Sequence, residues 1–281
     1  MSIPQGALSF SIVTVTRNAG KHIGDCLRSV AMQTHPHVEH VIIDAQSRDG
    51  TEALVAEFGR NATFVSEPDD GIYDAMNKGV RLARGAYILF LGADDLLADE
   101  RALADAAAFL EREGRPDLVY GDLHVREADG SSSVFRPPQP EEALAFMVYG
   151  CLPHQSTLAK HAIFEAPVGL FDKRYCVHGD YDWFLRAFAA RGLRILYMPR
   201  TIGSFFGGGA SNQLERSHKE LCAIQNAYPP FREPEWLERR LLRFQDQTLA
   251  YRLMAQGRGN GLDALRRRAD AVMGRLFGRH G

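Results

Sequence analysis

The first half of the chain alternates short apolar runs with amphipathic segments. Four runs rich in β-branched and aromatic residues predict buried strands at residues 8–15, 38–44, 62–66 and 86–91. The segments between them repeat apolar residues every three or four positions, which predicts helices. One face of the last of these helices carries Ile72, Met76, Val80 and Ala83, and Gly85 is expected to cap its end. Alternating strands and helices predict a mostly parallel sheet covered on both faces.

The second half predicts a β-hairpin, a helix and one further strand. Their expected ranges are 117–125 and 131–138 for the hairpin strands, 179–192 for the helix and 193–199 for the last strand. Asp129 and Gly130 supply the hairpin turn. Pro199 is expected to stop the last strand, because proline cannot donate a ladder hydrogen bond.

A glycine triplet interrupts the segment 205–212, at Gly207, Gly208 and Gly209. Backbone amides in such a loop can cradle a phosphate. The surrounding pattern lacks a strand-to-helix phosphate motif, so a mobile lid is the simpler interpretation.

The tail after residue 233 is predicted to be helical and basic. Residues 235–281 contain ten arginines and five acidic residues, a balance of +5 in a chain of net charge −2. One apolar stripe of the tail consists of Leu262, Leu265, Ala269, Val272 and Leu276. Such a helix is typical of a segment that docks on an anionic membrane surface. A helix that packs on the rest of the protein, or on a second copy in a homodimer, is the competing interpretation.

Composition narrows the class of protein. With 281 residues, 45% of them hydrophobic, the chain can form one large domain, or one domain plus an appendage. The small net charge gives no field suited to nucleic acid, so no nucleic-acid partner is expected. Four scattered cysteines form neither a metal-binding pair nor a disulfide framework. No leader and no apolar run of roughly 20 residues is found, and we expect a reduced, cytoplasmic protein.

Polar residues follow each of the four predicted parallel strands. They are Thr16, Arg17 and Asn18 after the first strand, Asp44 after the second, Glu67 to Asp70 after the third, and Asp94 and Asp95 after the fourth. Ligands of open parallel sheets bind beyond the carboxyl ends of the strands. We therefore expect these clusters to converge on one edge of the sheet.

The acidic pair Asp94 and Asp95 is the first candidate for chemistry. Carboxylate oxygens at such an edge suit Mg²⁺ or Mn²⁺, which also bind phosphate oxygens and retain several waters. The alternative is a solvated turn in which an aspartate caps the helix expected near Asp99.

A second set of candidates lies further along the chain. Asp180 and Asp182 fall in the first turn of a predicted helix, where the helix dipole alone would favour them. A carboxylate there could also act as a general base. His154, in the polar loop after Pro153, is either structural or ligand-facing, and His178 is equally ambiguous.

Taken together, four segments resemble the family 2 glycosyltransferases. They are "SIVTVTRNAGKHIGDCLRSVAMQT", "VIIDAQSRDGT", "SEPDDGIYDAMNKGVRLARGAYILFLGADD" and "GDYDWFLR". The resemblance covers roughly residues 8–210 and is strongest to the branch that builds bacterial surface polysaccharides. It implies the GT-A fold, a Rossmann-like three-layer α/β/α arrangement with a mostly parallel central sheet, here followed by a helical C-terminal extension.

The resemblance also implies roles for the matched residues. Asp44 matches the residue that hydrogen-bonds the nucleotide base, and Asp94 and Asp95 match the D-x-D motif for metal and diphosphate. Asp180 matches the catalytic base of inverting members, and its near neighbour Asp182 is the second candidate for that role. His154 and Gln155 match a pair on the acceptor side. The expected donor-binding residues are Thr16, Arg17, Asn18, Asp44, Asp70, Lys78 and Asp94.

Three positions depart from the family pattern. The usual second aspartate after the second strand is Ala45, and the usual leading aspartate of the metal motif is Gly92. A common arginine in the helix before the fourth strand is Met76, so Lys78 or Arg81 is expected to supply positive charge near the diphosphate.

The resemblance thus predicts an inverting, metal-assisted glycosyltransferase. It would move a sugar from a UDP- or GDP-linked donor to a glycan or lipid-linked acceptor, in the cytoplasm or on the inner face of the membrane. The expected domains are 1–233 (a donor half, 8–97, and an acceptor half, 98–212) and the tail 234–281. The alternatives are a non-catalytic sugar-nucleotide-binding or scaffold subunit and a sugar nucleotidyltransferase, although "VTRNAGKH" fits the latter poorly.

Overall fold

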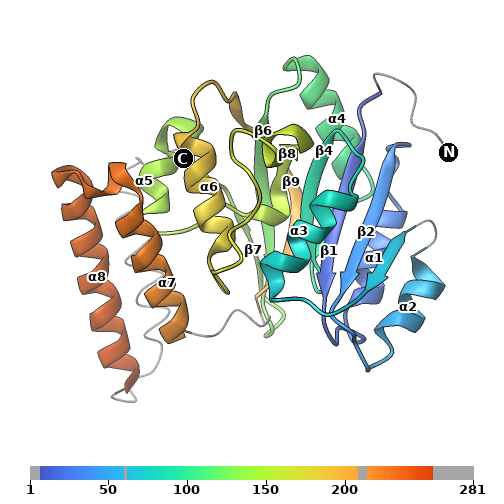
Figure 1. Cartoon of the computed structure of the whole chain (residues 1–281), viewed down its shortest axis with the longest axis horizontal. Coiled ribbons are helices and arrows are strands. Elements are labelled where there is room, and N and C mark those ends of the chain that lie inside the picture. The colour runs from blue at the N-terminus through green and yellow to red at the C-terminus, as the bar shows by residue number, and fades with distance from the viewer. Residues whose placement is uncertain (1–6, 60–61, 208–213, 256–281) are drawn as a thin grey trace. The chain divides into compact units, whose positions relative to one another are not determined.

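The computed structural model describes residues 7–59, 62–207 and 214–255 of the chain (Figure 1). These residues form two compact units. The first contains residues up to Ala143 together with Leu152–Leu221, and the second contains Leu144–Cys151 and the residues from Cys222 onward. The predicted division at 233/234 lies within the second unit, at the start of its last helix, and stays a prediction.

The first unit is built around one sheet. Its strands are β1 (Phe10–Thr16), β2 (Val38–Asp44), β3 (Thr63–Ser66), β4 (Tyr87–Gly92), β5 (Leu96–Leu97), β6 (Leu118–Arg126), β7 (Ser132–Phe135), β8 (Thr157–Lys160) and β9 (Ile195–Phe206). The strand order is β3-β2-β1-β4-β8-β6-β9-β5, with β7 paired to β6. Strands β3, β2, β1 and β4 are all parallel, and most paired residues of the whole sheet lie in parallel ladders. The α/β architecture expected from the sequence is therefore confirmed.

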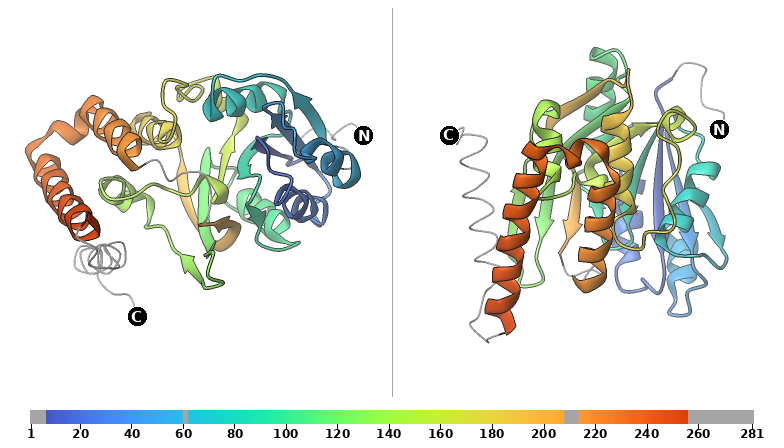
Figure 2. Two further views of the ribbon diagram at one scale, coloured as in Figure 1. Left: turned by 90° about the horizontal axis from the view of Figure 1, so that it is seen from below. Right: turned by 60° about the vertical axis from the view of Figure 1, so that its left-hand side comes forward.

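Helices cover both faces of this sheet (Figures 1 and 2). The helices that begin in the first unit are α1 (Ile23–Ala31), α2 (Thr51–Phe58), α3 (Ile72–Leu82), α4 (Ala102–Arg112), α5 (Pro140–Met147), α6 (Gly179–Ala189) and α7 (Leu214–Ala227), with the short 3₁₀ helices η1 (His154–Ser156) and η2 (His161–Phe164). Side chains of α1 and α4 share a core with Phe10 and Ile12 of β1. Helix α3 packs on the opposite face, where Gly79 meets Val13. Alternate residues of β1 thus serve the two helical layers.

Two details differ from the sequence-based expectation for α3. The helix ends at Leu82, and its C-cap is Ala83, whose extended backbone breaks the helical geometry, so Gly85 is not the cap. Gly85 instead allows a close approach of two segments, because a Cβ there would lie 2.5 Å from the backbone nitrogen of Ser11. Ile72 is 48% exposed and does not share the buried face of Met76 and Val80.

The last strand also differs from its expected range. Pro199 does not end β9, which continues to Phe206. The β6–β9 register shifts from Gly121 opposite Met198 to Asp122 opposite Thr201, so Pro199 lies in a bulge, where its missing N–H breaks no ladder bond. The expected loop therefore begins later, and the positions 208–212 lie outside the described residues.

The second unit is helical. It contains the end of α5, the last residues of α7, η3 (Pro229–Arg232) and α8 (Pro234–Ala255). Phe231 is its buried centre, in ring contact with Tyr228 and Trp236. Helix α8 begins where the sequence predicted the tail helix to begin, and it exposes Leu237, Leu241 and Leu242. The predicted stripe Leu262, Leu265, Ala269, Val272 and Leu276 lies outside the described residues. No helix in the described ranges is long and apolar enough to cross a membrane.

The contact between α3 and β1 generates a stability prediction. A Cβ at Gly79 would lie 2.3 Å from Cγ1 of Val13, which is buried and β-branched. We expect Gly79→Ala to lower the free energy of unfolding by about 1–3 kcal/mol through overpacking, despite the better helix propensity of alanine. Urea denaturation would measure the change.

Gly24→Ala is the matched control, because a Cβ there meets Arg28 at an ordinary 3.6 Å. This substitution in α1 should raise stability by about 0.5–1 kcal/mol. Equal effects of the two alanines would contradict the close packing of α3 on β1.

Candidate active site

The parallel strands end side by side at one edge of the sheet. Thr16 lies opposite Asp44, and Val15 lies opposite Gly92. Asp94 and Asp95 follow Gly92 directly. The strand ends therefore bring together the polar clusters that the sequence expected to converge there.

Asp44 organises the loops after β1 and β2. It is 1% exposed, and its carboxylate accepts hydrogen bonds from the backbone and hydroxyl of Ser47 and from the hydroxyl of Ser66, at 2.7 Å for Ser66. Asn18, in the left-handed region, donates its backbone N–H to Ser47 and accepts from the backbone of Arg48. Much of the hydrogen-bonding capacity of Asp44 is thus used by the protein itself.

The remaining donor-side candidates differ in how far they are engaged. Thr16 has a buried hydroxyl with no hydrogen-bond partner among the described residues, which favours a ligand contact. Arg17 is exposed at the same edge. Asp70 is exposed and pairs with Lys173, at 3.0 Å between Nζ and the carboxylate. Lys78 pairs with Glu67 at 2.8 Å and donates to the carbonyl of Pro68, so a diphosphate contact would require these bonds to open.

Asp95 is a buried carboxylate that the fold holds in place. It is 2% exposed, and its two oxygens accept from the backbone N–H of Phe206 at 3.1 Å and of Gly92 at 3.2 Å. The side chain of Gln155 adds another hydrogen bond. Burial, together with the adjacent charge of Asp94, raises the pKa of Asp95 against the opposing effect of these donors and of His154.

The departure at Gly92 opens space for two carboxylates. A Cβ at this position would lie 2.7 Å from Oδ2 of Asp95 and 3.0 Å from Oδ1 of Asp94, so both oxygens converge over the glycine. This oxygen pair fits a hard divalent cation, whose positive charge would offset two adjacent negative ones. The described residues contain no group of three metal-ligating side chains, so other ligands would come from water or phosphate.

Asp180 lies at the start of α6 and faces α3 and η1. Its Oδ1 accepts from the hydroxyl of Tyr73 at 3.0 Å and from the backbone of Tyr181 at 2.9 Å, and its Oδ2 lies 3.1 Å from Nδ1 of His154. Burial acts to raise the pKa of Asp180. The hydrogen bond and charge of His154, the charge of His178 and the hydrogen bond from Tyr73 together outweigh burial and lower that pKa. Asp180 is therefore an ionised carboxylate at neutral pH.

The 3₁₀ helix η1 connects the two acidic centres. His154 contacts Asp180, and the next residue, Gln155, contacts Asp95. Burial acts to lower the pKa of His154, but the hydrogen bond and charge of Asp180 raise it overall. A small cavity beside this pair is lined mainly by the apolar side chains Ile88, Phe90, Ala159, Phe164, Phe171, Trp183 and Phe184. These apolar surroundings strengthen the ion pair, whose side chains are 30% exposed at His154 and 16% exposed at Asp180.

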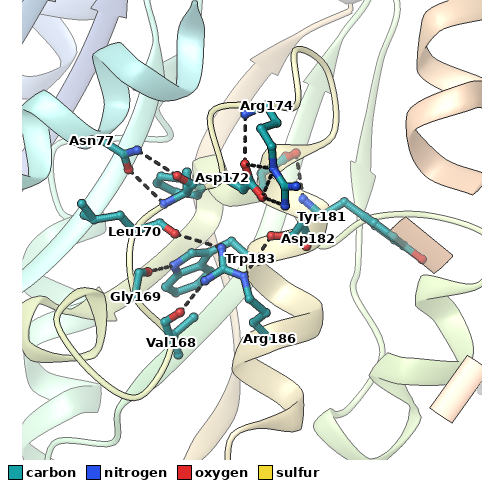
Figure 3. A network of polar contacts seen from close by, with 12 residues as sticks. Asn77, Val168, Gly169, Leu170, Asp172, Arg174, Tyr181, Asp182, Trp183 and Arg186 are labelled. Carbon is teal, nitrogen blue, oxygen red and sulfur yellow. Dashed lines mark hydrogen bonds and ion pairs between the residues drawn. The ribbon is translucent and has the colours of Figure 1, made fainter. Parts of the chain in front are cut away.

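Asp182 points into a different network (Figure 3). Its carboxylate accepts from Nε of Arg186 at 2.9 Å, and Arg186 also donates to the carbonyls of Val168 and Leu170. The indole of Trp183 donates to the carbonyl of Gly169 beside them. Burial raises the pKa of Asp182, although Arg186 opposes the effect. Asp182 thus braces the loop before α6 through Arg186, and the pair formed by His154 and Asp180 does not include it.

Sequence reasoning missed two residues that shape this site. Tyr73 donates to Asp180 from α3, and the backbone of Phe206 caps Asp95 from the end of β9. Both contacts join positions about a hundred residues apart, 107 and 111. The sequence offered two weak signals. Tyr73 lies within the segment "SEPDDGIYDAMNKG", which carried the resemblance, and Phe206 lies in the glycine-rich segment 205–212.

Comparisons with known proteins agree with this architecture. The model of the family "Glycosyl transferase family 2" matches residues 11–154. A PGL/p-HBAD biosynthesis glycosyltransferase of Mycobacterium bovis is 35% identical over 205 residues, which cover 71% of this chain and 78% of the relative. The amylovoran biosynthesis glycosyltransferase AmsB of Erwinia amylovora is 29% identical, with 64% of each chain covered.

Solved structures show the same fold at low sequence identity. S. aureus TarS 1–349 in complex with UDP-GlcNAc aligns with a TM-score of 0.64 at 20% identity, covering 90% of this chain and 75% of that one. The mannosyltransferase PcManGT from Pyrobaculum calidifontis, in complex with GDP-Man and Mn²⁺, aligns with a TM-score of 0.61 at 18% identity, covering 99% and 89%.

The ion pair between His154 and Asp180 can be tested by titration. Asp180→Asn removes the negative charge that holds the pKa of His154 up, so burial should then lower that pKa below its wild-type value. NMR titration of the imidazole ring would measure the shift, with His154→Gln used to assign the resonance. His40, which contacts Thr14 and whose pKa burial lowers to about 4, is the internal reference. An unchanged His154 pKa in Asp180→Asn would contradict the pairing.

Proposed function

We propose that this chain, which belongs to glycosyl transferase family 2, is an inverting enzyme. It would move a sugar from a nucleotide-sugar donor to a hydroxyl of a glycan or lipid-linked acceptor. Sugar transfer in bacterial polysaccharide biosynthesis follows from the family and its named relatives. The observation that carries the finer proposal is the placement of ionised Asp180 and the acidic pair Asp94 and Asp95 on either side of η1.

The donor would lie along the edge where β1, β2 and β4 end. Thr16 has an unused buried hydroxyl there, and Asp44 and Asn18 hold the surrounding loops. TarS was solved with UDP-GlcNAc and PcManGT with GDP-Man, which supports a nucleotide sugar as donor. We propose a UDP- or GDP-linked sugar.

Mg²⁺ or Mn²⁺ would be held by Asp94, with Asp95 beside it. Bound there, the ion would supply a positive charge that stabilises the departing diphosphate. Asp95 is fixed by backbone donors, so it would orient the loop and add charge. The side chain of Asp94 makes no hydrogen bond or ion pair with the residues that the structure describes, so Asp94 is the more available ligand. The Mn²⁺ complex of PcManGT supports this proposal.

Asp180 would accept the proton of the attacking acceptor hydroxyl. The oxygen of that hydroxyl would form a bond to the anomeric carbon while the bond from that carbon to the diphosphate oxygen breaks. One such displacement inverts the anomeric centre. The lowered pKa of Asp180 keeps it deprotonated and ready to accept a proton, and His154 and Tyr73 hold its orientation.

A cytoplasmic enzyme that meets lipid-linked acceptors would work at the inner membrane face. The exposed leucines Leu237, Leu241 and Leu242 of α8 and the basic composition of the tail support peripheral docking. A homodimer formed through the tail is the alternative use of this surface.

The metal proposal predicts a specific loss of binding. In the presence of Mn²⁺, Asp94→Asn should bind UDP or GDP about tenfold more weakly than the wild type, because the variant loses one charged ligand. EDTA should lower wild-type affinity and leave the variant nearly unchanged. Isothermal titration calorimetry would measure both, with Glu52→Gln, an exposed carboxylate on α2, as control. Equal wild-type affinity with Mn²⁺ and with EDTA would contradict the metal role.

The base proposal predicts different consequences for two nearby aspartates. Asp180→Asn should retain nucleotide binding and lose transfer by roughly 10²- to 10⁴-fold, because an amide cannot accept the proton. Asp182→Asn should lower the free energy of unfolding by about 1–3 kcal/mol through loss of its bond to Arg186, and should retain turnover below the unfolding transition.

Release of UDP or GDP from nucleotide sugars, measured beside urea denaturation, separates the two roles. An inactive Asp182→Asn with an active Asp180→Asn would reverse the assignment. Release of pyrophosphate from UTP or GTP and a sugar 1-phosphate would favour a nucleotidyltransferase, and no donor turnover with Mn²⁺ would favour a scaffold subunit.

A further inference from the structure

Arg126 is a cation at the candidate active site that has no role in the proposed mechanism so far. It is the last residue of β6, and its Nη2 donates to the backbone carbonyl of Asp94 at 2.8 Å. Its Nε donates to the hydroxyl of Ser204 at 2.9 Å, and its guanidinium lies 5.7 Å from the ring centre of Phe206. A half-buried arginine is therefore anchored directly beside the acidic pair.

The backbone places Arg126 as firmly as its side chain does. In the parallel β6–β9 ladder Arg126 lies opposite Phe206, and its carbonyl accepts from the backbone of Gly207 at 2.8 Å. Phe206 is also the residue whose N–H caps Asp95. Arg126 and the acidic pair are thus tied to the same strand end, which leaves the guanidinium little freedom to move away.

No aspartate or glutamate side chain in the described ranges pairs with Arg126, whereas Arg186, Arg194 and Arg200 each have a carboxylate partner. The guanidinium also has more N–H donors than its two hydrogen bonds use. A planar fork with unused donors is suited to the oxygens of a phosphate.

The order of the strands indicates which phosphate this would be. Asp44 ends β2, Thr16 ends β1 and Asp94 follows β4, whereas β6 lies on the other side of β4, beyond β8. A donor whose nucleoside lies against β1 and β2 would therefore reach Asp94 with its diphosphate and Arg126 with the phosphate furthest from the nucleoside.

We propose that Arg126 binds the distal phosphate of the nucleotide-sugar donor, the phosphate that bears the sugar. This inference rests on the proposed function and adds a residue to it. Arg126 would then hold the leaving diphosphate from the side opposite the nucleoside, and it would supply a positive charge that Lys78, engaged with Glu67, does not offer. A purely structural Arg126 would only brace the Asp94 carbonyl.

Calorimetry with nucleoside mono- and diphosphates distinguishes these roles. The probes are UDP, GDP, UMP and GMP, each titrated with Mn²⁺ into wild-type protein and Arg126→Gln. A contact to the distal phosphate predicts that Arg126→Gln weakens diphosphate binding about tenfold or more and changes monophosphate binding far less. Arg126→Lys, which keeps the charge but not the fork, should fall between the two and serves if Arg126→Gln does not fold.

Arg136→Gln is the matched control, because Arg136 follows the same hairpin and its side chain is 72% exposed. Its nucleotide affinities should equal those of the wild type. Equal losses of mono- and diphosphate affinity in Arg126→Gln, or no loss at all, would overturn the proposal while leaving donor binding intact. Wild-type protein that binds neither UDP nor GDP would instead overturn the proposed function, and the role of Arg126 with it.

Discussion

The structure depends on the requirement that a buried carboxylate be surrounded by hydrogen-bond donors. Asp44 and Asp95 are buried and Asp180 is half-buried, and each draws donors from distant parts of the chain. Asp95 takes an N–H from the end of β9, and Asp180 takes a hydroxyl from α3. Satisfying these charges fixes the loops at the sheet edge, so the demands of burial also assemble the site.

The two carboxylates of each acidic pair have different surroundings. In the first pair, Asp95 is held by backbone donors, whereas the side chain of Asp94 makes no hydrogen bond or ion pair within the described ranges. In the second, Asp182 is held by Arg186, while Asp180 faces His154 and Tyr73. One member of each pair anchors the backbone that carries the other, which is an economical way to present a carboxylate in a defined position. The replacement of the usual leading aspartate by Gly92 fits this pattern, because a side chain there would collide with both oxygens of the first pair.

The sequence predicted the parallel strands and their shared edge well, because strands buried on both faces are continuous apolar runs and their carboxyl ends meet. It predicted Asp94 and Asp95 as candidates for the same reason. Asp180 became a candidate through its place in the first turn of a predicted helix and through the family resemblance. It could not predict that β9 passes Pro199, since the bulge opposite β6 is a property of the pairing. Nor could it find Tyr73 or Arg126, whose partners lie far away in the chain and are decided by tertiary packing.

A direct displacement of the diphosphate, with Asp180 as the proposed base, would invert the anomeric centre. The stereochemistry of the first-formed product therefore tests the role proposed for Asp180. The enzyme would be incubated with an α-linked nucleotide sugar that it turns over. ¹H NMR of the anomeric proton, recorded at once, reports the configuration of the transfer or hydrolysis product before mutarotation. Inversion predicts the β configuration in the first-formed product. A first-formed α product would mean a retaining route, and would contradict the role assigned to Asp180.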